Sequence, residues 1–228
     1  MEKQAEYITV GDIATNCWLY PLDDTPDASG GRPCVVIDPG DEAARIMSRL
    51  GILNWVPRYI FLTHGHLDHV AGLPDLLGAL EGKGYLPPKI GIHRLDAQYL
   101  GKNSLAVHRA SFAAGGDYSY VDAVWKPMPE ADILFGDGDT AGPFRVMHLP
   151  GHTPGSAGLY DEKHGIIFSG DTLFLEGVGR TDLPGGNPDA LRQSLKRLLA
   201  LKEETTVCPG HGGTLTIKEA AAFLKGMF

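Results

Sequence analysis

The stretch at residues 61–70 reads Phe61-Leu62-Thr63-His64-Gly65-His66-Leu67-Asp68-His69-Val70 and places three histidines and one aspartate within six positions. The apolar run at 59–62 that leads into it predicts a short buried strand, because β-branched and aromatic residues bounded by polar residues and glycine are typical of strands. The polar residues therefore stand at the carboxyl end of a strand, where open α/β sheets place their ligand crevices. Imidazole and carboxylate groups at this spacing suit zinc, iron or manganese, and little else requires them. We predict a metal site formed by His64, His66, Asp68 and His69.

The composition of the 228 residues is that of a globular protein. Hydrophobic residues make up 43% and charged residues 21%, and the formal net charge is -8. This charge argues against a broad nucleic-acid-binding surface, which needs clustered lysine and arginine. The sequence has no long apolar run and no signal-peptide pattern, so we expect no membrane segment and a cytoplasmic location. The length fits one large domain, and we expect residues 1–228 to form it.

The three cysteines are Cys17, Cys34 and Cys208. Their odd number and wide spacing predict neither a disulfide framework nor a Cys-x-x-Cys metal pair. We interpret them as buried or partly buried thiols.

Several segments predict strands that alternate with helices. The apolar runs 34–38 and 89–92 have strand composition. Between them, Asp41 is suited to cap a helix that Gly51 would end. Alternation of this kind indicates an α/β sandwich.

Residues 94–130 have the least regular pattern. Residues 96–100 could form a helix, but Gly115-Gly116, Pro127 and Pro129 indicate irregular chain, which in a compact domain is either a lid over a substrate or a mobile excursion. Three aromatic residues there could line a substrate pocket or pack a loop, namely Tyr118, Tyr120 and Trp125.

Three further polar residues follow apolar strand-like runs in the second half of the chain. His152 lies in Pro150-Gly151-His152-Thr153-Pro154-Gly155, Asp171 in Ser169-Gly170-Asp171-Thr172, and His211 in Pro209-Gly210-His211. Sequence separation alone brings none of them together, but a sheet whose strand ends share one edge would. The remaining histidines stand apart from these motifs, and we expect structural or surface roles for His93, His108, His148 and His164. His148 also ends the strand that leads to His152, so it could support that residue.

These four motifs, from Thr63-His64-Gly65-His66-Leu67-Asp68-His69 to Pro209-Gly210-His211, resemble the metallo-β-lactamase superfamily in type and order. The resemblance covers almost the whole chain. It implies an α/β fold of the four-layer αββα kind, in which two sheets pack face to face, helices cover the outside and metals lie at one edge.

The resemblance also implies two ligand sets. His64, His66 and His152 would hold one metal, Asp68, His69 and His211 the other, and Asp171 would bridge them. Two divalent ions about 3.5–4 Å apart can hold a hydroxide and polarise a substrate carbonyl. We expect zinc, with iron or manganese as alternatives. Asp68 and Asp171 would partly neutralise the ions, and we assign a catalytic role to Asp68.

The segment Val178-Gly179-Arg180-Thr181-Asp182-Leu183-Pro184-Gly185-Gly186 resembles the glyoxalase II-like group of short hydrolases. This implies a small-molecule thioester substrate such as S-lactoylglutathione. Arg180 stands where that group has a basic residue that holds glutathione, and a guanidinium suits a carboxylate. Arg180 could equally pair with Asp182 to stabilise its loop. Asp182 and Gly213 stand where glyoxalase II has aromatic residues.

Two other functions fit the same motifs. Persulfide dioxygenases share the seven-residue pattern and a Gly-Arg-Thr-Asp stretch, and they hold a single iron at the three-ligand set for oxygen chemistry. Members with a degenerate site act as binding or regulatory modules, but all seven ligand types are present here. Asp171 resembles the hydrolase branch and not the β-lactamases of the zinc-cysteine type, so we do not expect antibiotic hydrolysis.

Overall fold

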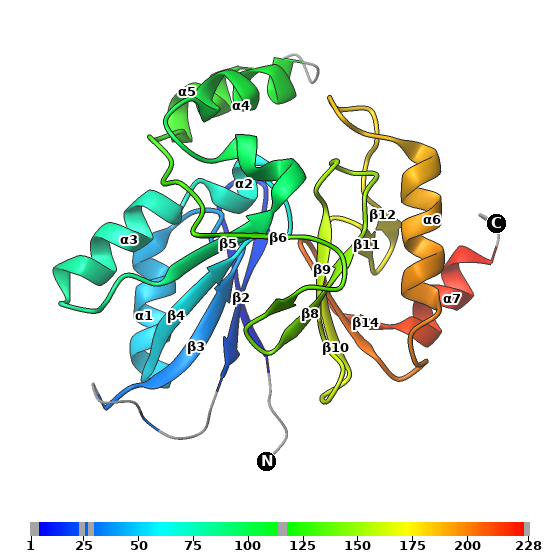
Figure 1. The fold of residues 1–228 in the computed structure, drawn as a ribbon, viewed down its shortest axis with the longest axis horizontal. Helices are drawn as coiled ribbons and strands as arrows, with labels where there is room; N and C mark the ends of the chain where they lie inside the picture. Colours follow the sequence, from blue (N-terminus) through cyan, green and yellow to red (C-terminus); the bar gives the residue numbers. More distant parts are fainter. Residues whose placement is uncertain (1–4, 23–25, 27–29, 114–117, 226–228) are drawn as a thin grey trace.

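The computed structural model describes residues 5–22, 26, 30–113 and 118–225. These residues form two six-stranded sheets that pack face to face with helices on both outer faces (Figure 1). The predicted αββα sandwich is confirmed. Gly115, Gly116 and part of the segment between β2 and β3 lie outside the described residues.

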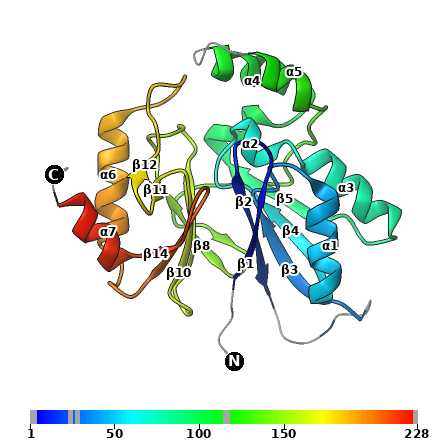
Figure 2. The ribbon, with the colours of Figure 1, turned by 180° about the vertical axis from the view of Figure 1, so that it is seen from behind.

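The first sheet contains the strands of the first half of the chain in sequence order. They are β1 (Glu6–Val10), β2 (Thr15–Pro21), β3 (Arg32–Ile37), β4 (Trp55–Phe61), β5 (Lys89–His93) and β6 (Ile133–Phe135). From β3 to β6 neighbouring strands are parallel, so their carboxyl ends meet at one edge. Helices α1 (Ala43–Leu53) and α3 (Leu73–Gly82) cover the outer face, as Figure 2 shows from behind.

The second sheet has the order β14-β13-β10-β9-β8-β7. Its strands are β7 (Thr140–Ala141), β8 (Phe144–His148), β9 (Ala157–Asp161), β10 (Ile166–Gly170), β13 (Thr206–Pro209) and β14 (Leu215–Thr216). Helices α6 (Pro188–Leu199) and α7 (Ile217–Leu224) cover its outer face, and the short pair β11 (Leu173–Phe174) and β12 (Gly177–Val178) stands apart.

Aromatic side chains fill the space between the sheets. Phe61 comes from the first sheet and Phe144 and Phe168 from the second, and their rings meet edge to face. Strand alternation divides β3 between two cores: Val35 faces this layer, whereas Val36 faces the helices. Each fully buried side chain of this size stabilises the fold by about 1.5–3 kcal/mol. All three cysteines are buried free thiols, as predicted.

Helix α1 does not have the predicted ends. Asp41 does not cap it, because the helix starts after Glu42, which lies in the left-handed region with φ 48° and makes no side-chain cap bond. The helix continues past Gly51 to Leu53 and ends at Asn54, whose φ is 55°. Asparagine tolerates this conformation better than most residues, so it replaces the expected glycine.

In the segment 94–130 the possible helix at 96–100 is largely matched by a 3-10 helix, but the expectation of irregular chain was wrong for most of the described residues after it. This segment forms a 3-10 helix η1 (Arg94–Tyr99), α4 (Ser104–Ala113) and α5 (Ser119–Val124), and the two α-helices lie above the sheet edges (Figure 1). The buried face of α4 consists of Ser104, His108 and Ser111. A helix that buries polar residues has no apolar periodicity for a sequence pattern to detect. Within the described ranges, no helix is both long and apolar enough to cross a membrane.

Candidate metal centre

The first four predicted residues, at positions 64–69, lie in one short segment after β4, at the edge of the first sheet. His64 lies in the loop after β4, and His66 is the N-cap of the one-turn helix α2 (Leu67–Val70). This helix then carries Asp68 and His69. His64, His66 and His69 are all buried.

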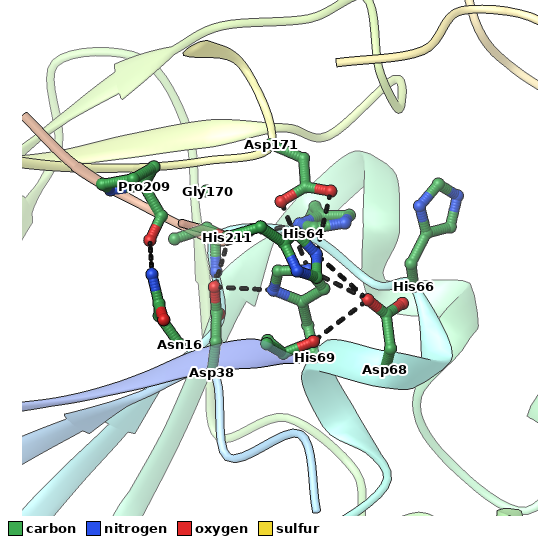
Figure 3. A network of polar contacts seen from close by, with 12 residues as sticks. Asn16, Asp38, His64, His66, Asp68, His69, Gly170, Asp171, Pro209 and His211 are labelled. Carbon is green, nitrogen blue, oxygen red and sulfur yellow. Dashed lines mark hydrogen bonds and ion pairs between the residues drawn. The ribbon is translucent and has the colours of Figure 1, made fainter. Parts of the chain in front are cut away.

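The other three residues come from three separate loops of the second sheet. His152 follows β8, Asp171 follows β10, and His211 follows β13. Figure 3 shows Asp171 and Asp68 approaching the cluster from opposite sides, with His64 and His69 between them. The structure thus brings all seven predicted side chains to one edge of the sandwich.

Three compact groups of possible ligands occur among the described residues, and one of them, Asp38, His64 and His69, shares a histidine with each of the other two. His64, His66 and His152 form the group that we call the three-histidine group. One nitrogen from each lies within 4.8 Å of the others. Nδ1 of His66 and Nε2 of His152 are 2.8 Å apart. Nitrogens this close, from three buried imidazoles, could hold one metal ion.

Asp68, His69 and His211 form the second group, which we call the aspartate group. Their ligand atoms also lie within 4.8 Å of one another. Oδ2 of Asp68 is 3.4 Å from Nε2 of His69 and 3.3 Å from Nε2 of His211. This set of two imidazoles and a carboxylate could hold a second ion.

Asp171 lies between the two groups. Its Oδ1 is 3.3 Å from Nε2 of His69, and its Oδ2 is 3.6 Å from Nε2 of His152 and 3.5 Å from Nε2 of His211. One carboxylate therefore faces residues of both groups, as a bridging ligand would.

The donor atoms at the centre fit a metal ion. Nε2 of His64, Nε2 of His69 and Oδ1 of Asp171 are buried and have no hydrogen-bond partner within the described chain. Buried polar atoms in proteins are seldom left unpaired, because doing so costs about 1–3 kcal/mol each. A cation at the cluster would supply the missing partner for all three.

The pKa values differ between the two groups. Burial, with nearby His152, lowers the pKa of His66 to about 3, and burial also lowers the pKa of His64 well below its usual range. Burial acts to lower the pKa of His211 too, but hydrogen bonds to Asp171 and Asp68 outweigh it and raise the pKa to about 9. His64 and His66 are therefore held as neutral imidazoles, the form that binds metals.

Asp38 is a residue of the site that the sequence analysis missed. It follows β3 with φ 53° and accepts hydrogen bonds from Thr63 N at 2.8 Å and Thr63 Oγ1 at 2.6 Å. Its Oδ2 is also 3.0 Å from Nδ1 of His69, which leaves Nε2 of that ring to face the cluster. The signal was present, because Asp38 is a polar residue directly after an apolar strand, like the predicted ligands.

Asn16 is a second missed residue. Its Nδ2 donates to Pro209 O at 3.2 Å and to Gly212 O at 2.8 Å, so one amide holds both sides of the His211 loop (Figure 3).

Glycines allow the backbone to approach the centre. A side chain on Gly40 would overlap the carbonyl oxygen of Asp68, and one on Gly179 would overlap that of Asp171. A side chain on Gly210 would meet the Asp171 carboxylate itself. The ligand loops can therefore pack against one another as they do only because these three positions are glycine.

A cavity of about 180 Å³ opens onto the cluster. Apolar side chains form part of its wall, and its lining residues are Ile13, His66, Asp68, Ser111, Phe112, His152, Asp171, Arg180, Leu183 and His211. Arg180 therefore lies at the pocket, but its guanidinium also donates two hydrogen bonds of 2.7 Å to Asp182. The structure thus contains the pairing that was one of the two interpretations of Arg180.

The aromatic residues of 118–125 pack around α4. Tyr120 stacks on Phe112 with a centroid distance of 5.1 Å, and Trp125 donates to Ser104 Oγ at 3.4 Å. Tyr118 is half exposed. None of the three is among the residues that line the cavity, and Phe112 provides the aromatic contact there.

The other four histidines have contacts outside the ligand groups. His148 stacks on His93 at 4.2 Å, and its Nε2 lies 2.8 Å from Pro154 O, so it supports the loop that carries His152. His108 donates to Tyr99 O at 2.9 Å, and His164 lies 2.9 Å from Asp161.

A model of the metallo-beta-lactamase superfamily matches residues 10–211. The chain therefore belongs to the metallo-β-lactamase superfamily, a family of metal-dependent hydrolases.

Three relatives illustrate the range of similar proteins. The hydroxyacylglutathione hydrolase GloC of Haemophilus influenzae is 34% identical over 213 residues, which are 93% of this chain and 92% of that protein. The structure of TTHA1623 in a di-iron-bound form has 35% identity and a TM-score of 0.73, with 95% of this chain and 96% of that one covered. The B3 metallo-β-lactamase BLEG-1 has 29% identity and a TM-score of 0.76, with 96% and 97% covered.

Proposed function

We propose that this protein is a metal-dependent hydrolase that cleaves a thioester such as S-lactoylglutathione. The observation that carries the proposal is the convergence of two ligand groups and Asp171 beneath a pocket with apolar walls. The similarity to GloC, a hydroxyacylglutathione hydrolase, supports the substrate class.

In this proposal the three-histidine group holds one divalent ion, the aspartate group holds the other, and Asp171 lies between them. When bound, the two ions would polarise the substrate carbonyl and make water a nucleophile near neutral pH. Zinc is our first choice because imidazole and carboxylate ligands suit it, and the similarity to di-iron TTHA1623 makes iron the alternative.

Asp68 has a catalytic role in this proposal because it faces the pocket. Burial acts to raise its pKa, but neighbouring His69 and the hydrogen bond from His211 outweigh burial and lower the pKa to about 2. Thr15 Oγ1 donates to Oδ2 of Asp68 at 3.1 Å and helps to hold the carboxylate in place. An ionised, fixed carboxylate beside the pocket can accept a hydrogen bond from an entering water molecule and orient it.

The pocket walls suit a small acyl group. Ile13, Phe112 and Leu183 offer apolar surface, which would exclude water from the acyl part of a thioester. Arg180 donates to Asp182 through Nε and Nη2, so the other side of its guanidinium, at Nη1 and the second Nη2 hydrogen, would be the side that binds a carboxylate of glutathione.

The principal test is His66→Ala. We expect the variant to lose turnover of S-lactoylglutathione while its circular dichroism stays near that of the wild type, because His66 lies in the pocket as well as in the three-histidine group. His164→Ala, at the turn before β10, is the matched control and should retain activity. Full activity of His66→Ala would refute the site assignment.

Elemental analysis with three parallel assays distinguishes the alternatives. Two metals per chain and thioester cleavage support the proposal. One iron and oxygen uptake with glutathione persulfide would indicate a dioxygenase, and hydrolysis of a β-lactam would indicate a lactamase. A chain that binds no metal and turns over nothing would be a regulatory module.

A further inference from the structure

Asp96 is a carboxylate with 0% exposure that lies between two of the ligand loops. It belongs to η1, in the segment where the sequence analysis named possible pocket residues but no residue that supports a metal ligand. A buried carboxylate is costly to remove from water and is retained only where hydrogen bonds compensate for the lost hydration. The hydrogen-bond partners of Asp96 therefore indicate which segments its carboxylate holds in place.

One partner is in the loop of the first sheet. Gly65 N, between His64 and His66, donates to Oδ2 of Asp96 at 3.0 Å. This amide is the middle of the His-x-His turn, so its position determines where the two imidazoles on either side begin.

The other two partners are in the His152 loop of the second sheet. Thr153 Oγ1 donates to Oδ2 at 2.7 Å, and Gly155 N donates to Oδ1 at 2.7 Å. The approach is too close for any adjustment, because a Cβ on Gly155 would lie 2.5 Å from the carboxyl carbon of Asp96.

Each hydrogen bond that the structure gives Asp96 thus ends on one of the two loops of the three-histidine group. Asp38 has the corresponding place beside His69 of the aspartate group. Asp38 also accepts from Thr63, the residue before His64, so its contacts extend to both groups, whereas those of the Asp96 carboxylate lie at the three-histidine group.

We propose that Asp96 is a positioning residue that fixes the spacing between the His64–His66 turn and the His152 loop, and so sets the metal affinity of the three-histidine group. This inference rests on the metal centre proposed above, but it requires no particular substrate. Loss of an outer hydrogen-bond partner of a metal ligand typically lowers metal affinity by about 10- to 100-fold.

The test is Asp96→Asn, which keeps the shape of the side chain but replaces one acceptor oxygen with an NH₂ group. Because backbone N–H groups can only donate, Gly65 N or Gly155 N then loses its partner. The matched control is Asp161→Asn, at the end of β9, where it pairs with Ile166 at the start of β10, away from Asp171. Asp161 is also buried and accepts from a hydroxyl, Tyr20 OH at 2.7 Å, and from a backbone amide, His164 N at 3.1 Å.

Zinc retention against graded chelator is measured for each variant, without any substrate. Asp96→Asn should release one of two zinc ions at a chelator concentration at least about tenfold lower than the wild type requires. Asp161→Asn should retain both ions as the wild type does. The inference is overturned if Asp96→Asn retains both ions as tightly as the wild type, or if it loses both equally.

Two double variants assign the ion that is lost. In a His211→Ala background the remaining zinc occupies the three-histidine group, and adding Asp96→Asn should weaken it. In a His66→Ala background the remaining zinc occupies the aspartate group, and adding Asp96→Asn should leave it unchanged. The opposite pattern would overturn the inference, whatever the outcome of the thioester assay.

Thr153→Val provides the test if Asp96→Asn does not fold. It removes one of the three hydrogen bonds and keeps the size of the side chain. We expect a smaller shift in the same direction, a few-fold in chelator concentration, and an unchanged retention curve would count against Asp96.

Discussion

The two halves of the sandwich contribute to the centre in different ways. The first half provides His64, His66, Asp68 and His69 from one short stretch that ends in α2. The second half provides one residue from each of three loops, after β8, β10 and β13. In the first half the local backbone determines how the ligands are spaced. In the second half the three ligands lie far apart in sequence, so the local backbone of each loop does not set the spacing between them.

The second half is positioned instead by hydrogen bonds to the first. Thr63 O accepts from Ala157 N at 2.8 Å, beyond the His152 loop, and Asn16 N donates to Gly210 O at 2.7 Å, beside His211. Backbone groups of the first half thus fix the positions of the ligand loops of the second half. Three predictions test this division.

The largest effect is expected for Asp171→Asn. Its carboxylate faces His69 of the first half and His152 and His211 of the second, so the variant should weaken metal binding by both groups. We expect turnover to fall by more than the roughly 100-fold that loss of an outer partner costs. Metal content and kcat measure this, and loss of only one ion would show that Asp171 serves a single group.

A smaller effect is expected for Asp38→Asn, which changes only the first half. The variant weakens the contact that orients His69, so the aspartate group should lose about 10- to 100-fold in zinc affinity. The three-histidine group should lose less, because Asp38 contacts it only through Thr63, the residue before His64. Chelator titration should show the larger loss of zinc affinity at the aspartate group in this variant, and at the three-histidine group in Asp96→Asn. Identical losses would mean that the groups do not respond separately.

The smallest effect concerns a contact between the halves, the stack of His93 on His148. Burial, with nearby His148 and Arg94, lowers the pKa of His93 from 6.5 to about 4, although Asp137 and Asp139 oppose this. Between these values the unfolded chain binds more protons than the folded one, so the contribution of neutral His93 to stability is present above pH 6.5 and is lost as pH falls towards 4.

His93→Asn removes this titration. In chelator-treated protein, the Tm of the wild type should therefore fall more steeply than that of the variant between pH 6.5 and 4. Parallel curves of Tm against pH for the two proteins would show that the titration of His93 does not contribute to the pH dependence of stability.

The sequence was informative wherever chemistry and local pattern coincide. The strands β3, β4 and β5 are apolar runs, and each of the seven predicted residues follows a strand at the same edge. That part of the site could be predicted, because strand ends and ligand types are both visible in a single sequence.

The rest could not be predicted, because its signal lies in contacts between distant segments. Asp96 reaches Gly65 across 31 positions and Gly155 across 59, and its partners are backbone amides that any sequence would provide. Helix α4 buries Ser104, His108 and Ser111, so it has no apolar stripe. At Asn54 a residue other than glycine took the left-handed conformation, which moved the end of α1.

The glycines around the centre bear on how its specificity could be changed in laboratory evolution. Gly40, Gly179 and Gly210 have no room for a side chain, so libraries that vary them would yield damaged scaffolds. Gly213 differs, because an added Cβ would meet only Leu175 at 3.5 Å, an ordinary contact. It lies with Phe174, Leu175 and His211 on a second cavity of about 490 Å³. New side chains can therefore be introduced beside the metal centre at Gly213 without displacing a ligand.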